Sequence, residues 1–202
     1  MAKRAAPEVN AGSMADIAFL LLIFFLVTTT IEKDSGINRK LPPMEESEED
    51  VVIKQKNIFT ILINGKDQLL VEEERMELKD LRKAAVEFLD NNGDGSCTFC
   101  KGKRDPKSSD NPDKAIISLK NQRETSYAAY VAVQNEVMGA YNELRNRRAL
   151  EIGSQKGFPG MDFIKMQENY KDARWVGNKD KLKAVIDQIK EEIPQKFSEV
   201  ID

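Results

Sequence analysis

The sequence predicts a single N-terminal transmembrane helix followed by a small α/β domain, a two-layer sandwich with helices on one face of a sheet. Three observations support this fold class. Residues 12–31 are apolar apart from hydroxyls and one carboxyl, whereas 32% of the whole chain is charged. From about residue 57, strand-like runs and helical periodicities follow in the order β-β-α-β-α. The length of 202 residues leaves room for one membrane span and one modest domain.

The apolar stretch at residues 12–31 is expected to be an uncleaved membrane anchor. A helix rises about 1.5 Å per residue, so this stretch just crosses a hydrocarbon core about 30 Å thick. The alternative, a cleaved signal peptide, would need a small-x-small site, whereas three threonines follow the apolar run. Lys3 and Arg4 precede the helix and an acidic cluster follows it at 45–50. The positive-inside rule therefore places the polar tail, residues 1–11, in the cytoplasm and the rest across the membrane.

Residues 32–56 are predicted to be an extended linker. They contain Gly36, the Pro42-Pro43 pair and the acidic run at 45–50. Such a composition does not bury a core. The folded domain is therefore expected to begin near Asn57 and to occupy residues 57–202.

The first half of the domain is predicted to contain a hairpin and an amphipathic helix. Strands at 58–63 and 68–71 are indicated because the Asn64-Gly65 turn separates two β-rich runs. Apolar residues at helical spacing predict a helix over 77–90 that covers the sheet. The polar residues 91–113 that follow form a long loop or insertion.

The second half is expected to contain a strand at 115–119 and a long helix capped by Thr125 or Ser126. A C-terminal extension starts at about residue 150, with a loop at 153–160. Two helices follow, the second of which is stopped by Pro194; they are expected at 161–174 and 181–193, with an edge strand or frayed tail at 197–201.

Asp16 is the single charged residue of the apolar stretch, and two explanations are open. In the first, Ser13 and Asp16 form an S-x-x-D capping box, and the helix dipole favours the carboxylate. In the second, Asp16 lies inside the membrane, where an ionisable group costs about 2.5–3.5 kcal/mol on insertion scales and is functional by default. A carboxyl in an apolar site holds a proton until it reaches water. Asp16 could then use the proton gradient, although a single span needs a partner to enclose a proton path.

Several function classes are excluded or disfavoured by composition. The chain has no histidine, which removes the commonest general base and metal ligand. It has neither of the glycine-rich phosphate-binding motifs, so nucleotide binding and enzymatic activity are not expected. The sequence pI is about 5.3 and no basic stripe is present, so no nucleic-acid partner is expected.

Cys97 and Cys100 lie in the insertion, on the side of the membrane where thiols oxidise, and a local disulfide is the simplest interpretation. A thioredoxin-like redox pair would need a helix start after the cysteines, and a zinc site would need two more ligands. The insertion also resembles the first half of a calcium loop, but Lys101 occupies the position of the bidentate glutamate. No metal is therefore expected.

The N-terminal residues resemble a known family. Asn10 precedes the membrane aspartate Asp16, the apolar run ends in Val-Thr, and Leu41-Pro42 follows in the linker. This pattern is similar to that of the ExbD/TolR family of proton-driven inner-membrane stators. The hairpin and the helix from Tyr127 are similar to the family's small periplasmic domain.

The resemblance implies that Asp16 carries protons in a dimer of these helices, inside a ring of an ExbB-like multi-span channel subunit. The coupling ion would be the proton, with no other cofactor. The periplasmic domain would engage a TonB-like transducer or peptidoglycan. Residues that could support the proton path or helix packing are Asn10, Ser13, Thr28 and Thr29, and Leu41 and Pro42 would belong to a linker segment that adds as a strand to a domain edge.

Three alternatives to an ExbD-like motor subunit remain at this point. The first is a TolR-like envelope stator that binds the cell wall. The second is a passive anchor that displays a periplasmic binding domain, in which Asp16 has no role. The third is an anchored thiol oxidoreductase, in which Cys97 is the reactive residue.

Overall fold

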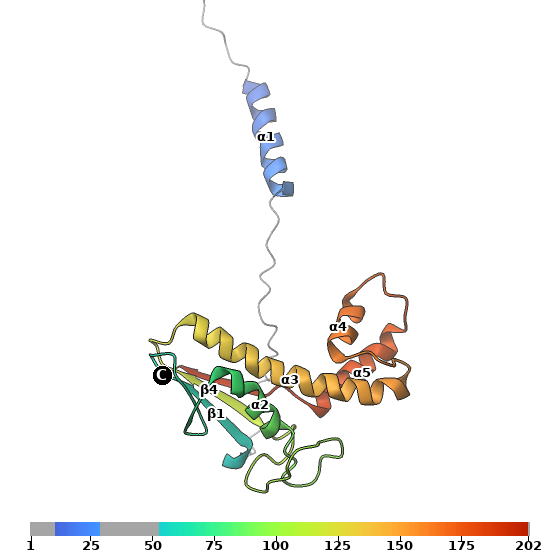
Figure 1. Ribbon diagram of the computed structural model, residues 1–202. Helices are drawn as coiled ribbons and strands as arrows, with labels where there is room; N and C mark the ends of the chain where they lie inside the picture. Colours follow the sequence, from blue (N-terminus) through green and yellow to red (C-terminus); the bar gives the residue numbers. More distant parts are fainter. Residues whose placement is uncertain (1–10, 29–52, 202) are drawn as a thin grey trace, which may run out of the picture. The chain divides into compact units, whose positions relative to one another are not determined.

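The computed structural model describes residues 11–28 and 53–201 (Figure 1). The chain divides into two units, residues 1–49 and 50–202, which we describe separately. The first unit contains one helix, α1 (Ala11–Thr28). The second begins with a 3-10 turn, η1 (Gln55–Asn57), at the end of the predicted linker, of which residues 32–52 lie outside the described part of the chain.

The second unit is built on a five-stranded mixed sheet with the order β3-β2-β1-β4-β5. Strand β1 pairs antiparallel with β2 and parallel with β4, and β5 lies parallel to β4 at one edge. The strands are β1 (Ile58–Ile63), β2 (Leu69–Val71), β3 (Glu74–Met76), β4 (Ile116–Asn121) and β5 (Phe197–Ile201). The small α/β domain expected from the sequence is therefore present.

The β1–β2 hairpin forms where the Asn64-Gly65 signal predicts it. The Asn64 side chain accepts hydrogen bonds from the backbone amides of Lys66 (3.0 Å) and Gln68 (2.9 Å), which holds the turn closed. The next turn, between β2 and β3, places Glu72 and Glu73 at φ values of 51° and 70°. Such positive φ values usually select glycine or asparagine, so this turn, and with it β3, could not be predicted from sequence.

Helices α2 (Leu78–Leu89) and α3 (Tyr127–Lys156) cover one face of the sheet. Ser126 is the N-cap of α3, because its hydroxyl accepts a hydrogen bond from the Ala129 amide at 3.2 Å. Alternate residues of the strands point toward these helices and are buried. The main core combines these residues with the inner faces of both helices, including Ile61, Ile117, Leu81, Val137 and Tyr141.

The C-terminal extension forms a second, smaller core beside the last turns of α3. It contains α4 (Phe163–Lys171) and α5 (Lys179–Glu192), which pack against α3 and not on the sheet (Figure 1). Its buried residues include Ala149, Ile152, Phe163, Met166 and Leu182. The prediction that all helices lie on one face of the sheet is therefore correct for α2 and α3 only.

Two predictions for the extension are corrected. The loop expected at 153–160 is shorter, because α3 continues to Lys156 and ends at Gly157, which has φ 88°. Gly153 lies inside α3 and is buried against the turn after it; an added Cβ would lie 2.8 Å from the Phe158 carbonyl oxygen. The C-terminus is not a frayed tail, since residues 197–201 form the parallel edge strand β5.

Candidate functional site

Asp16 is the one charged residue in the sequence of α1, AGSMADIAFLLLIFFLVT. The described part of the helix begins at Ala11, and its first turn contains no acidic residue. The side chain of Ser13 is not among those described, so the S-x-x-D capping box stays one of the two explanations of Asp16.

The surroundings of Asp16 along the helix are apolar or small. Helical spacing places Gly12, Phe19 and Leu20 on the same side of α1 as the carboxyl. Phe19 and Leu20 are 61% and 58% exposed. The carboxyl therefore lies on a helix side that offers it apolar neighbours and no cation.

Large apolar side chains cover every side of α1. Those described, from Met14 to Phe25, are between 39% and 62% exposed, and none of them is buried. The rings of Phe24 and Phe25 contact each other edge to face, with centroids 5.7 Å apart. A helix that is apolar all round is normally buried in a protein or a membrane.

Within residues 11–28 and 53–201, no helix is long and apolar enough to cross a membrane. The span predicted for 12–31 continues past Thr28 into residues outside the described part of the chain. Asn10, Thr29, Leu41 and Pro42 also lie outside it, and the side chains of Ser13 and Thr28 are not among those described. The roles assigned to these six residues stay predictions.

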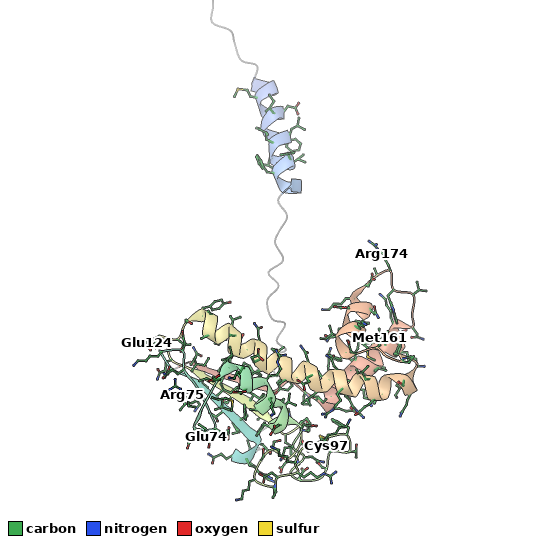
Figure 2. All side chains as sticks on the ribbon, in the orientation of Figure 1. Glu74, Arg75, Cys97, Glu124, Met161 and Arg174 are labelled. Carbon is green, nitrogen blue, oxygen red and sulfur yellow. A yellow bond between two sulfur atoms is a disulfide. The ribbon has the colours of Figure 1, made fainter. Side chains whose placement is uncertain are left out.

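The second candidate site is the loop between α2 and β4, which includes the predicted insertion. Cys97 and Cys100 form a disulfide there, and Cys100 is buried. Figure 2 labels Cys97 in this loop. The amide of Asn91 donates to the carbonyl oxygens of Asp105 and Ser109, both at 2.8 Å, which holds the two sides of the loop together. The insertion is therefore a packed structural element.

Asp90 and Asp94, the two acidic residues of the calcium-like pattern, are paired with cations of the chain. Asp90 accepts two hydrogen bonds from the Arg147 guanidinium, at 2.8 and 2.5 Å. Asp94 pairs with Lys114 at 2.8 Å, and this ammonium, together with Ser96, holds the pKa of the Asp94 carboxyl well below its usual value. Among the described residues, no three histidine, cysteine or acidic side chains are placed to hold a metal ion. The calcium-like pattern of the sequence thus corresponds to a set of internal ion pairs.

Comparison with known families tests the resemblance found in the sequence. The family model described as "Biopolymer transport protein ExbD/TolR" matches residues 2–146. The chain belongs to the ExbD/TolR family. The match includes Asp16, the strands β1 to β4 and the first part of α3, and the resemblance inferred from Asn10, Asp16 and Leu41-Pro42 is confirmed.

A relative within this family is the biopolymer transport protein exbD2 of Vibrio cholerae serotype O1 (strain ATCC 39315 / El Tor Inaba N16961). It is 28% identical over 87 residues, or 43% of this chain. The chain covers 61% of the length of that ExbD relative. The ExbD/TolR match ends at residue 146, so α4, α5 and β5 lie beyond it.

Sequence reasoning missed the arginines that fasten this ExbD/TolR domain together. Arg147 binds the loop residue Asp90, and Arg148 binds Glu192 of α5 at 2.6 Å. Arg145 is buried and donates twice to the Ile193 carbonyl, at 3.0 and 2.8 Å. The only signal in the sequence was a cluster of three arginines in one helical turn, and it does not reveal partners so distant along the chain.

Proposed function

We propose that this chain is the ExbD-like subunit of an inner-membrane motor that couples the proton motive force to TonB-dependent transport across the outer membrane. Asp16 is its proton-carrying residue. The observation that supports this role is a single carboxyl in the second turn of a helix that is otherwise apolar on all sides. Family membership supports the same assignment.

In this proposal the apolar stretch 12–31 lies in the membrane, with the N-terminus in the cytoplasm and the second unit in the periplasm. Away from water, the neutral form of a carboxyl is favoured. Asp16 then binds a proton on one side and releases it on the other, and each proton delivers about 2.3 kcal/mol per 100 mV of membrane potential. The role needs no catalytic residue and no cofactor besides the proton.

The proposed partners follow from what α1 lacks. One helix cannot enclose a proton path, so a second copy of α1 and a surrounding ring of an ExbB-like multi-span subunit supply its walls. The second unit passes the motion to a TonB-like transducer. The name of the Vibrio cholerae relative favours this ExbD-like role over a TolR-like stator that binds peptidoglycan.

Two other function classes are disfavoured. A thiol oxidoreductase needs a reactive cysteine at a helix start, whereas Cys97 and Cys100 lie in a loop and are joined as a disulfide. A passive anchor gives no functional reason for a carboxyl in the second turn of an otherwise apolar helix.

The test is proton flux in vesicles that contain the full chain together with the multi-span protein that co-purifies with it. A membrane potential is imposed with potassium and valinomycin, and a trapped pH dye reports proton entry. We expect Asp16→Asn to abolish the flux while the complex still assembles, and Asp16→Glu to retain part of it. Asp80→Asn, at an exposed position in the first turn of α2, is the matched control.

Unchanged flux in the assembled Asp16→Asn complex would contradict the proposal and favour the passive anchor. Cross-linking from the second unit then separates the two stator types, because a TonB-like transducer is expected as the product for the ExbD-like role. Recovery of peptidoglycan alone would assign the TolR-like role.

A further inference from the structure

The loop between α4 and α5, residues 172–178, presents an apolar and basic tip. Val176 is 99% exposed, so its side chain has no protein contact, and its neighbours are Trp175 and Arg174. Figure 2 shows Arg174 at the outer end of this loop. We define the tip as Arg174–Val176; it lies beyond the part of the chain matched by the family model.

The tip is held in a defined conformation. At its start, the amide of Arg174 donates to the Asp172 carboxylate at 2.9 Å, and the Lys179 ammonium donates to the Asp172 carbonyl at 2.6 Å. At its end, Asn178 caps α5 by accepting from the Lys181 amide at 2.8 Å. A loop fixed at both ends does not have to order when it binds, which lowers the entropic cost of contact.

Trp175 connects the tip to the second core. Its ring packs on Phe158, with centroids 6.3 Å apart, and remains half-buried. The indole crosses the position that a Cβ at residue 177 would occupy, which explains the glycine there. Beside the ring lies a shallow hollow of about 380 Å³, lined mainly by apolar groups from residues including Phe158, Pro159, Met161 and Trp175, with Lys156 and Lys181 also at its wall.

The surroundings of the tip are basic, although the whole chain carries a net charge of −3. Residues 156–183 contain seven lysines and arginines against four acidic residues. Within the described part of the chain, no ion pair joins Lys156, Arg174 or Lys181 to an acidic side chain. The tip therefore offers an exposed valine, a half-exposed indole and unpaired positive charge on one surface.

We propose that the tip docks on the surface of a bilayer that contains anionic phospholipid. Tryptophan and arginine suit the headgroup region, where an amphipathic ring and a cation both find partners. Basic side chains near an anionic surface each contribute about 1 kcal/mol. This inference depends on one part of the proposed function, namely that α1 holds the domain beside a membrane.

The tether makes a weak contact sufficient. Residues 29–52, even fully extended, span at most about 86 Å, so α1 in a membrane would hold the second unit within that distance of the bilayer. Under such tethering the local concentration of lipid surface is high, so the docking equilibrium does not need the affinity of a free protein. An acidic protein partner would use the same positive charge, but it would need no valine fully exposed at the tip.

The test uses Trp175, the single tryptophan of the chain, as a built-in probe. The full chain is reconstituted into phosphatidylcholine vesicles with or without phosphatidylglycerol, both with brominated acyl chains that quench nearby indoles. We expect a blue-shifted emission and at least twofold stronger quenching in the anionic vesicles. The double variant Arg174→Glu, Val176→Asp is expected to lose this difference, whereas Tyr127→Asp, 80% exposed at the start of α3, is expected to keep it.

Three results would overturn the inference. The first is equal, weak quenching in both lipids while the chain still floats with vesicles after an alkaline wash. This result would support membrane anchoring by α1 and contradict docking of the tip. The second is an emission change on addition of soluble polyglutamate but none with anionic vesicles, which would assign the tip to an acidic protein. Failure of the chain to float would contradict both this inference and the proposed function.

Discussion

Replacement of Arg147 tests how the insertion is attached to α3. The Asp90 side chain is 8% exposed, and two guanidinium hydrogen bonds of 2.8 and 2.5 Å satisfy it. The Lys101 amide donates a further bond at 3.1 Å. In Arg147→Met the carboxylate stays in place without its cation, whereas in Asp90→Asn the arginine, 29% exposed, can turn to water.

The two substitutions are therefore expected to differ in cost. Loss of one partner of a fully buried ion pair costs about 3–5 kcal/mol. Because Arg147 is partly exposed, water can reach Asp90 after the change, and we reduce the expected loss for Arg147→Met to about 2–3 kcal/mol. Asp90→Asn keeps an acceptor for the Lys101 amide and is expected to lose about 1–1.5 kcal/mol. The double variant should cost little more than Asp90→Asn.

The assay is urea unfolding of the full chain in a neutral detergent, followed by Trp175 fluorescence and by circular dichroism. In a thermal unfolding experiment, the same loss of about 2–3 kcal/mol would lower the melting temperature by about 5–10 °C for a domain of this size. Arg123→Met, at an exposed loop position, is the control and should change stability little. Equal costs for both single variants, or additive costs in the double variant, would refute the idea that Asp90 is the buried member of a coupled pair.

Three further predictions concern the same domain. Reduction of the Cys97–Cys100 disulfide, or Cys97→Ser, should lower the free energy of unfolding by about 2 kcal/mol or less, because the closed loop is short. Proton flux should stay unchanged. Loss of flux would instead support a redox role for the cysteines. The Lys114 ammonium lowers the pKa of Asp94, so the Asp94 carboxylate stabilises the fold fully above the unfolded-state pKa near 4, and this contribution is lost as the pH falls further. In Asp94→Asn the free energy of unfolding should therefore decline less steeply in acid. Urea unfolding at stepped pH measures this difference. Gly153→Val should lower stability by about 1–3 kcal/mol, because its Cβ meets a backbone oxygen at 2.8 Å; an unchanged melting temperature would show that the turn after α3 can move.

Local patterns in the sequence were sufficient for most elements of the domain. The boundaries of β1 agree with the β-rich run at 58–63, and α2 and α5 lie within two residues of the amphipathic stripes that predict them. Each of these elements buries one face, so the alternation or the helical spacing of apolar residues is visible in the sequence itself. Strand β3 has no such pattern, since Glu74 and Arg75 are exposed and only pairing with β2 makes it a strand.

Asp16 and its apolar neighbours were evident from sequence alone, because twenty residues with one charge do not occur by chance in a hydrophilic chain. Which explanation of Asp16 holds is left to the proton-flux experiment, because the residues before Ala11 lie outside the described part of the chain. The tertiary structure decided what the C-terminal extension is: α4 and α5 close a second core and return the chain to the sheet as β5. Arg145, Arg147 and Arg148 found partners 44 to 57 residues away, and spacing along a chain carries no information about such contacts. The sequence alone thus determined the local elements and the lone carboxyl of the apolar stretch, whereas long-range packing decided how the extension, the insertion and the tip at Val176 are presented.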